Sequence, residues 1–464
     1  ISAIPRQSKH EEKIAAWLRD WAAKHALDHA ADSKGNVVIR VPASPGCEDA
    51  PVVILQGHMD MVCEKTPGST HDFSKDAIKL VYDGDWITAT DTTLGADNGI
   101  AVALALAAAE TDSHPRLELL MTVDEETGLT GANALGKDFV EGRILLNLDS
   151  EDQGVFTIGC AGGKDALLSL ESAKVDIEAG AKGMEITVGG LVGGHSGVDI
   201  HRGRANANKL LSRVLASLIR EAKAAIVSIS GGSVRNAIPR DARAIVAIRA
   251  EHVGKALQLV EESASVFQSE YHSTDRNISL SADPVSLNGS KRYTNESGAN
   301  LIHLLRVLPN GPREYSADIH GLVETSSNMA VIEENGGRVQ VHTSQRSSVM
   351  SQLDDLTEAI TSAGTLAGAS VRSENSYPPW TPKTDSELLR RAKDVYVDVF
   401  SKEPKIEAIH AGLECGVIGA KYPGMDMISF GPTIRHAHSP DECVNIPSIE
   451  STWKYLKALL TSFI

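Results

Sequence analysis

The chain has 464 residues and carries 61 acidic against 45 basic side chains, which gives a formal net charge of -16. This acidic balance argues against nucleic acid or an anionic membrane as a partner, since both need a basic face. A chain of this length is too long for one ordinary hydrophobic core, so we expect two domains. The 5 cysteines form no Cys-x-x-Cys pair. Their odd number and scattered spacing predict reduced thiols and a cytoplasmic location. The chain has neither an apolar run of roughly 20 residues nor a signal-peptide pattern, so we expect no membrane span.

Apolar periodicity predicts alternating helices and strands in the first third of the chain. Residues 11–25 have the spacing of an amphipathic helix, and residues 100–109 form an alanine-rich run that is too long for a strand. Short apolar runs predict strands at 36–41, 51–55, 117–123 and 144–148. This alternation predicts an α/β domain with a mostly parallel sheet flanked by helices.

Acidic and histidine side chains follow three of these strands. His58 and Asp60 follow the strand at 51–55, Glu125 and Glu126 follow the strand at 117–123, and Asp149 follows the strand at 144–148. Each could be a solvated strand end. Three together indicate a site along the carboxyl edge of a parallel sheet.

Asp97 stands in a glycine-bounded turn, residues 95–99, just ahead of the predicted helix. A helix N-cap and a metal ligand need the same side chain in this place. The local pattern leaves both roles open for Asp97.

The pattern changes near residue 184, where alternating strands, helices and Gly/Ser turns begin and continue to about residue 377. This segment contains a predicted helix at 205–222 and strands at 225–230 and 242–248, enough to bury a core of its own. We therefore expect a first domain formed by residues 1–182 and 379–464, with an α+β domain inserted at 183–378. A loose repeat between residues 233–249 and 327–346 suggests two similar halves in the insert. Beyond it we expect a helix at 387–400 and a strand and turn at 428–432.

If the strand ends converge, their side chains supply nitrogen and oxygen ligands suited to divalent metal ions. Five ligands are available: His58, Asp97, Glu126, Asp149 and one of the late histidines, His436 or His438. Five exceed what one tetrahedral zinc takes from protein, but they fit two ions that share one carboxylate. Such a pair polarises a carbonyl and lowers the pKa of a bridging water, so no side-chain nucleophile is needed. Glu125 is the candidate base for the proton of that water.

A set of motifs spans the chain: QGHMDM at 56–61, TLGADNG at 93–99, EETG at 125–128, NLDSE at 147–151, GGHSG at 193–197, RNAIP at 235–239, HAGLECG at 410–416, GPT at 431–433 and HSPDE at 438–442. In this combination the chain resembles the aminoacyl-histidine dipeptidases, or cytosol non-specific dipeptidases. These belong to the di-zinc peptidase family that includes carnosinases, peptidase T and succinyl-diaminopimelate desuccinylase. The resemblance covers essentially the whole chain, and it implies a catalytic domain in two parts with a lid domain inserted between them.

The resemblance also implies how two zinc ions would be held. His58 and Asp149 would bind one ion, Glu126 and His438 would bind the other, and Asp97 would bridge them. Manganese or cobalt could replace zinc, because the same ligands accept all three.

Further roles follow from the same resemblance. Asp60 would orient the His58 imidazole, and Glu125 would be the general base and proton shuttle. His438 is preferred to His436 because it lies four residues before Glu442. Family members that act on free amino termini tend to have Asp at the position of Asp149, whereas acyl-removing members tend to have Glu.

The lid domain would contribute substrate contacts. His195, on a glycine-flanked loop, would stabilise the oxyanion with help from Asn236; without the resemblance, a flexible loop histidine would be the preferred interpretation. Arg346 could hold the terminal carboxylate of the substrate, although a surface arginine is a comparable alternative. Glu414 could pair with the ammonium group of the substrate.

We therefore expect a metal-dependent dipeptidase that hydrolyses unblocked dipeptides of broad sequence, including Xaa-His and carnosine. The alternative within the same fold is an N-acyl-amino-acid deacylase or carboxypeptidase, which Asp149 and Glu414 argue against. A binding protein without activity would have lost a metal ligand, and all five positions are present. The expected assembly is a homodimer, although a lid of two similar halves could supply the second half from the same chain.

Overall fold

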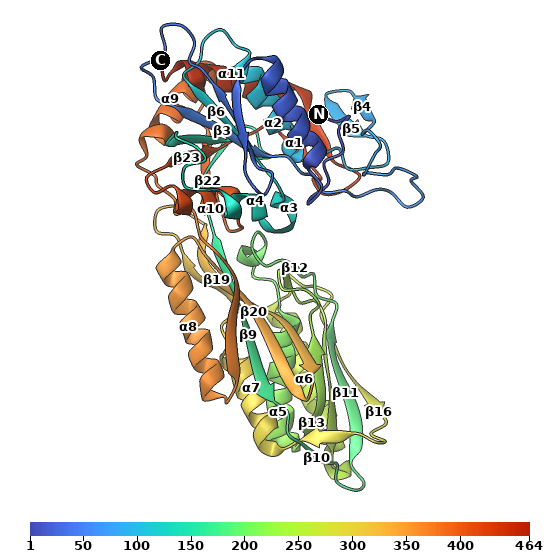
Figure 1. Cartoon of the computed structure of the whole chain (residues 1–464). Coiled ribbons are helices and arrows are strands. Elements are labelled where there is room, and N and C mark those ends of the chain that lie inside the picture. The colour runs from blue at the N-terminus through green and yellow to red at the C-terminus, as the bar shows by residue number, and fades with distance from the viewer. The chain divides into compact units, whose positions relative to one another are not determined.

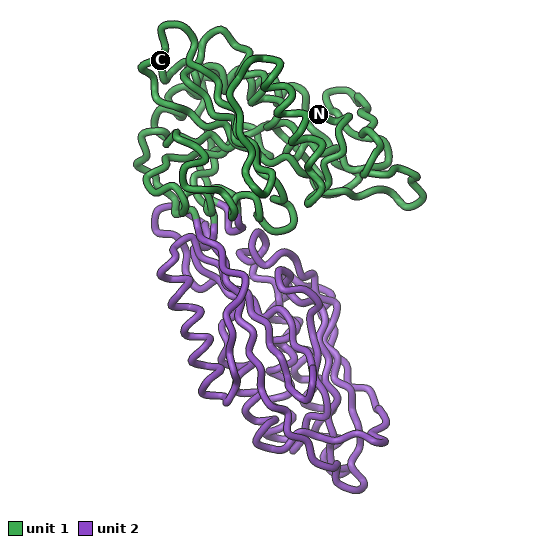
Figure 2. The backbone as a smooth tube through the Cα atoms, viewed as in Figure 1, with its two compact units in different colours: residues 1–160, 380–408, 413–464 green, residues 161–379, 409–412 purple.

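The computed structural model describes residues 1–464 and divides into two compact units. The first unit contains residues 1–160, 380–408 and 413–464, and the second contains residues 161–379 and 409–412 (Figures 1 and 2). None of the helices combines the length and the apolar character needed to span a membrane.

The first unit is built on an eight-stranded sheet with the order β1-β2-β6-β3-β7-β23-β8-β22, beside a four-stranded sheet with the order β24-β25-β5-β4. Strand β3 pairs in parallel with β6 and β7, and β7 pairs in parallel with β23. In chain order the elements are α1 (Glu12–Lys24), β1 (Asp28–Ala31), β2 (Val37–Val41), β3 (Val53–His58), β4 (Leu80–Asp83), β5 (Trp86–Ala89), α2 (Ala96–Ala109), β6 (Leu117–Thr122), α3 (Glu125–Gly128), α4 (Thr130–Ala134), β7 (Ile144–Asn147), β8 (Val155–Cys160), α9 (Glu387–Phe400), β22 (Lys405–Ile409), α10 (Glu414–Lys421), β23 (Asp426–Ser429), β24 (Ile434–Arg435), β25 (Cys443–Asn445) and α11 (Ile446–Thr461).

Strands β3, β6 and β7 form the centre of the larger sheet. Every residue of β3 and β6 is buried, as expected of strands that are covered on both faces. Helix α2 packs against β3 and β6 (Figure 1). A Cβ atom at Gly57 of β3 would lie only 2.5 Å from the Cβ of Ala101, so this close approach of α2 requires glycine. Because the three strands run in parallel, their carboxyl ends meet at one edge of the sheet.

The predicted elements of this unit occur close to their expected positions. Helix α9 coincides with the prediction at 387–400, and β2, β6 and β7 lie within the predicted strands. The helix predicted at 100–109 begins earlier, at Ala96, and its first turn is irregular because Asp97 and Asn98 have non-helical backbone angles. The strand predicted at 51–55 extends to His58, so the histidine is part of the strand rather than of the loop after it.

The second unit is built on a nine-stranded antiparallel sheet with the order β16-β11-β15-β13-β19-β20-β9-β21, in which β18 pairs with β19 beside this path. Only Gly231 and Ile332 pair where β13 meets β19. The sheet therefore has two groups of strands, but the similarity of two halves stays a prediction. In chain order the elements are β9 (Gly162–Glu171), β10 (Lys174–Asp176), β11 (Lys182–Gly189), β12 (Gly194–His195), η1 (Ile200–Arg202), α5 (Ala207–Ala222), β13 (Ala225–Gly231), β14 (Ala237–Ile238), β15 (Ala242–Ile248), η2 (Ala250–His252), α6 (Val253–Glu270), β16 (Ser279–Val285), β17 (Lys291–Tyr293), α7 (Asn295–Val307), β18 (Gly311–Tyr315), β19 (Val323–Asn335), β20 (Arg338–Ser347), α8 (Met350–Leu366) and β21 (Ser370–Tyr377).

The second unit begins earlier than the domain boundary expected at residue 183. It starts at Ala161, because β9 pairs with β20 and β21 along most of its length. These partners lie far along the chain, so the assignment of residues 161–182 depends on long-range pairing. The other end of this unit, at Pro379, lies next to the predicted boundary, and residues 409–412 join it from a separate segment.

Candidate active site

The candidate residues that follow the parallel strands lie at one edge of the sheet. His58 is the last residue of β3, Glu125 and Glu126 open helix α3 after β6, and Asp149 follows β7. His58 is 1% exposed, although it ends a strand. The predicted convergence of strand ends is therefore present in the first unit.

Asp97 lies between two histidines. Its Oδ1 is 3.0 Å from His58 Nε2, and its Oδ2 is 3.1 Å from His438 Nε2. Each histidine also approaches a second carboxylate: His58 Nε2 is 3.4 Å from Asp149 Oδ1, and His438 Nε2 is 3.0 Å from Glu126 Oε2. The five side chains thus form two groups that share the carboxylate of Asp97, and His438 rather than His436 completes the second group.

This set of donors suits divalent cations. The ligand atoms of His58, Asp97 and Asp149 lie within 4.8 Å of one another, and so do those of Asp97, Glu126 and His438. Carboxylates held this close in a largely buried place repel one another unless positive charge lies among them. Glu126 Oε1 is buried and has no hydrogen-bond partner, so it is available to an ion. The residues present fit a pair of divalent metal ions with one shared ligand.

The protonation of the cluster reflects the same crowding. Burial raises the pKa of the Asp149 carboxyl to about 6. Burial also opposes the ionisation of Asp97, but hydrogen bonds with His438 and His58 outweigh it and lower the pKa of Asp97. Hydrogen bonds to Asp97 and Glu126 raise the pKa of His438 to about 11.

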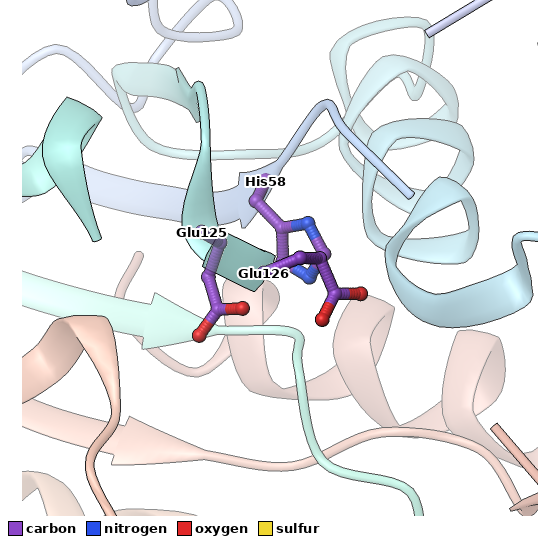
Figure 3. A group of neighbouring side chains, drawn as sticks. All are labelled: His58, Glu125 and Glu126. Atoms are coloured by element: carbon purple, nitrogen blue, oxygen red, sulfur yellow. The ribbon is translucent and has the colours of Figure 1, made fainter. Parts of the chain in front are cut away.

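Asp60 is completely buried behind His58. Its Oδ1 lies 3.3 Å from His58 Nδ1 and accepts a hydrogen bond from the Glu125 N–H at 3.1 Å, while its Oδ2 accepts one from the Glu126 N–H at 3.3 Å. One carboxylate thus orients the His58 ring and the first turn of α3. The Glu125 and Glu126 carboxylates lie on either side of the His58 ring in Figure 3.

Glu125 is a carboxyl that keeps its proton easily. Burial raises its pKa well above the ordinary range, and the charges of Asp149, Glu414 and Glu126 raise it further, against the opposing effect of His58. A carboxyl with a raised pKa is a better proton acceptor than an ordinary glutamate.

Glu414 lies at the start of α10 and is 0% exposed. Its Oε2 accepts hydrogen bonds from Gln56 Nε2 at 2.6 Å and from Thr122 Oγ1 at 2.7 Å, and its Oε1 is buried without a partner. Burial raises its pKa to about 7. The pairing of Glu414 with the ammonium group of a substrate stays a prediction, and the unpartnered Oε1 is the atom available for it.

His195 and Asn236 lie on adjoining segments of the second unit. Strands β12 and β14 pair His195 with Ala237, and the Asn236 carbonyl accepts a hydrogen bond from the Ser196 N–H at 2.8 Å. His195 Nδ1 accepts hydrogen bonds from the N–H groups of Gly197 at 3.1 Å and Val198 at 3.2 Å. A nitrogen that accepts carries no proton, so the neutral ring has its proton on Nε2. Burial, with the charge of Arg346, lowers the pKa of His195 and favours this neutral form.

Arg346 is a largely buried residue of β20, only 8% exposed. The alternative of a surface arginine is therefore wrong. Its Nη1 donates to the Tyr377 hydroxyl at 2.8 Å, and its Nε is buried without a partner. His410 lies in the same unit and is also buried, with Nε2 2.7 Å from Ser326 Oγ.

The sequence model described as peptidase family M20/M25/M40 matches residues 54–462. The chain belongs to this peptidase family. The predicted family is confirmed, and the chain is a metallopeptidase.

Two relatives match nearly all of this M20 peptidase. It is 41% identical over 462 residues to the cytosol non-specific dipeptidase of Escherichia coli (strain K12), which covers 99% of this chain and 95% of the relative. The crystal structure of aminoacylhistidine dipeptidase from Vibrio alginolyticus has a TM-score of 0.93 at 41% identity, covering 99% of this chain and 94% of that chain. The aminopeptidase PepT from Bacillus cereus has a TM-score of 0.56 at 15% identity and covers 100% of this chain and 95% of its own, which shows a shared fold. The predicted fold class is confirmed.

In the sequence of this M20 peptidase, Glu442 is notable only because it lies four residues after His438. In the structure, Glu442 accepts hydrogen bonds from the turn that precedes α2 and from the first residues of α2. Its Oε2 accepts hydrogen bonds from the N–H groups of Leu94 and Gly95, both at 2.8 Å, and its Oε1 accepts from Ala96 at 2.8 Å and Asp97 at 3.2 Å. Four successive N–H groups thus hold one buried carboxylate. The glycine-rich turn at 93–99 is the only local signal for this arrangement, because the acceptor is more than 300 residues away in the sequence.

Proposed function

We propose that this M20 peptidase is a dipeptidase that hydrolyses unblocked dipeptides of broad sequence, including Xaa-His and carnosine. The observation that carries the proposal is the shared-carboxylate cluster around Asp97, in a chain 41% identical to a cytosol non-specific dipeptidase over nearly its whole length. Asp149 agrees with it, since members of the family that act on free amino termini tend to have Asp at this position.

The proposed cofactors are two divalent metal ions, with zinc favoured and manganese or cobalt as alternatives. His58 and Asp149 would hold one ion, Glu126 and His438 the other, and Asp97 both. Bound there, such ions polarise a carbonyl and make a neighbouring water more acidic.

Glu125 is the proposed general base. Its carboxyl would take a proton from the attacking water and pass it to the leaving amine. The raised pKa of Glu125 supports both steps, because a group must hold the proton between them. Asp60 would fix the position of this base, since it accepts the Glu125 N–H while it faces His58.

Three residues of the second unit are proposed to bind the substrate. The Nε2–H of His195 would donate to the oxygen of the scissile carbonyl, with the Asn236 side chain as a second donor. The two hydrogen bonds that Nδ1 accepts support this role, because they leave the proton of the neutral ring on Nε2. Arg346 would hold the terminal carboxylate, which its free Nε and its exclusion from bulk solvent favour. Glu414, in the first unit, would pair with the ammonium group of the substrate through its unpartnered Oε1, while its Oε2 accepts from Gln56 and Thr122.

The proposed location is the cytosol, in line with the name of the Escherichia coli relative and with the predicted reduced state of the cysteines. The proposed assembly is a homodimer, which light scattering of the purified chain would test.

Hydrolysis of Ala-His, carnosine and acetyl-histidine by the metal-stripped protein, before and after addition of Zn²⁺ or Mn²⁺, tests the proposal. We expect metal-dependent cleavage of Ala-His with acetyl-histidine untouched. Cleavage of acetyl-histidine alone would identify a deacylase. No cleavage of any of the three with metal bound would refute the dipeptidase assignment.

A further inference from the structure

Arg6 is a buried arginine that joins two loops of the active site. It is 3% exposed. Its Nη1 donates to the carbonyl oxygens of Met59 at 3.1 Å and Asp60 at 2.9 Å, and its Nη2 donates to the carbonyl of Gly95. Met59 and Asp60 follow His58, whereas Gly95 precedes Asp97. One guanidinium therefore spans the two chain segments that present His58 and Asp97.

Two glycines leave the space that this guanidinium occupies. A Cβ atom at Gly99 would lie 2.7 Å from Arg6 Nη2, and a Cβ atom at Gly95 would crowd the same nitrogen. Gly95 also has a φ of +68°, which an L side chain rarely adopts. Both glycines belong to the motif at 93–99, so the motif gives Arg6 its place as well as presenting Asp97.

The residues next to Arg6 make contacts in the same region. Ser8 Oγ donates to Asp60 Oδ2 at 2.8 Å, and Glu11 Oε1 accepts the Asp124 N–H at 2.9 Å, one residue before Glu125. The Arg6 carbonyl accepts the Met61 N–H at 3.1 Å. The segment 6–11 thus reaches both the loop after β3 and the loop after β6.

Charge favours the same placement. The carboxylates of Glu442, Asp60 and Asp97 attract the positive charge of Arg6, and all three are largely buried. A guanidinium stays charged and presents its donors in a rigid planar fork, so it can satisfy several carbonyls at once. A lysine in this place could not reach two loops with comparable geometry.

We propose that Arg6 is a positioning residue of the catalytic centre, which holds the loop after His58 against the loop before Asp97 and so sets the spacing of the metal-ligand atoms. This inference rests on the proposed function for the identity of those ligands. Arg6 lies outside residues 54–462, which the family model matches.

Arg6→Gln and Arg6→Lys in the full chain test the proposal, with Arg19→Gln on the exposed face of α1 as the matched control. Zn²⁺ affinity of the metal-stripped proteins is measured by competition with a chelating indicator, and kcat and KM for Ala-His are measured at saturating Zn²⁺. We expect both Arg6 variants to bind Zn²⁺ about 10- to 100-fold more weakly, as for the loss of other partners of metal ligands. KM should stay within about twofold, because Arg6 does not touch the substrate, and Arg19→Gln should match the wild type.

Gly99→Ala keeps Arg6 and adds a residue with better helix propensity, so it covers the case in which the Arg6 variants do not fold. Its added methyl group would displace the guanidinium. We therefore expect weaker Zn²⁺ binding, and the unfolding temperature of the metal-free protein measures any accompanying loss of stability. Zn²⁺ affinity and kcat within about twofold of wild type in the folded variants would overturn the proposal, even if the unfolding temperature falls. A wild-type chain that binds Zn²⁺ but cleaves no dipeptide would refute the proposed function alone, since the affinity comparison would still decide the role of Arg6.

Discussion

Replacement of Glu442 by Gln should destabilise the first unit, because two of the four N–H groups that donate to Glu442 would lose their acceptor. In the structure each carboxylate oxygen of Glu442 accepts two N–H groups, from Leu94 and Gly95 on one oxygen and from Ala96 and Asp97 on the other. Gln has a single acceptor oxygen, and its amide nitrogen would face two N–H donors. Rotation of the amide does not help, because both sides of the site consist of donors only.

The size of the effect follows from this count. A buried donor that loses its acceptor costs about 1–3 kcal/mol, so two such donors cost about 2–6 kcal/mol. That is a large fraction of the roughly 5–15 kcal/mol by which folded proteins are stable. Glu442 is 2% exposed, so water cannot replace the lost acceptor without a rearrangement of the turn.

Urea unfolding followed by tryptophan fluorescence isolates the effect, since all 5 tryptophans lie in the first unit. Asp441→Asn is the control: it makes the same change of charge at the exposed neighbouring residue. We expect Glu442→Gln to lower the free energy of unfolding by at least about 2 kcal/mol relative to this control. A difference below about 0.5 kcal/mol, the scatter of surface substitutions, would refute the assigned hydrogen bonds.

Glu125→Gln should lower kcat for Ala-His about 10²- to 10⁴-fold with Zn²⁺ affinity nearly unchanged, in steady-state and metal-competition assays; near-normal kcat would exclude it as the base. Removal of metal by a chelator should lower the unfolding temperature reported by tryptophan, and Zn²⁺ at about 100 times its Kd should restore about 2.7 kcal/mol; equal temperatures with and without Zn²⁺ would contradict the fit of the site. Burial, with the charge of Arg346, lowers the pKa of His410 to about 3 from an ordinary 6.5. The unfolded chain therefore takes up a proton on His410 at a higher pH than the folded protein does. The second unit keeps its full stability above pH 6.5 and loses stability as pH falls toward 3. By pH 5 the second unit should lose about 2 kcal/mol in calorimetry, and His410→Asn should remove this slope; an equal slope in the variant would contradict it.

The convergence of the three strand ends could be predicted because its signals are local. A buried apolar run followed by acidic residues indicates a strand that stops at a site, and parallel strands bring their carboxyl ends together. The pairing of His58 with Thr122 places the end of β3 beside the end of β6, two residues before Asp124. The residues at each strand end can be identified without knowledge of distant parts of the chain, whereas the pairing of β3 with β6 is seen only in the structure.

Other features depend on contacts that local patterns do not contain. Strand β9 looks like an ordinary strand, and only its pairing with β20 and β21 assigns it to the second unit. The burial of Arg346 follows from its place in β20, whereas its sequence neighbours Gln345 and Ser347 are polar and give no sign of a covered strand. The enclosure of Glu414 likewise depends on Gln56 and Thr122, which come from two strands near the start of the chain.

The two possible roles of Asp97, helix cap and shared ligand, are separated by Glu442. Asp97 makes no capping hydrogen bond, and the N-terminal boundary residue of α2 is Gly95. The N–H groups at the start of α2 donate to the Glu442 carboxylate instead, which places a negative charge at the end of the helix where the dipole favours it. Both oxygens of Asp97 are therefore free to face His58 and His438. Because a single carboxylate cannot cap the helix and face two histidines at once, the distant Glu442 makes the shared-ligand geometry of Asp97 possible.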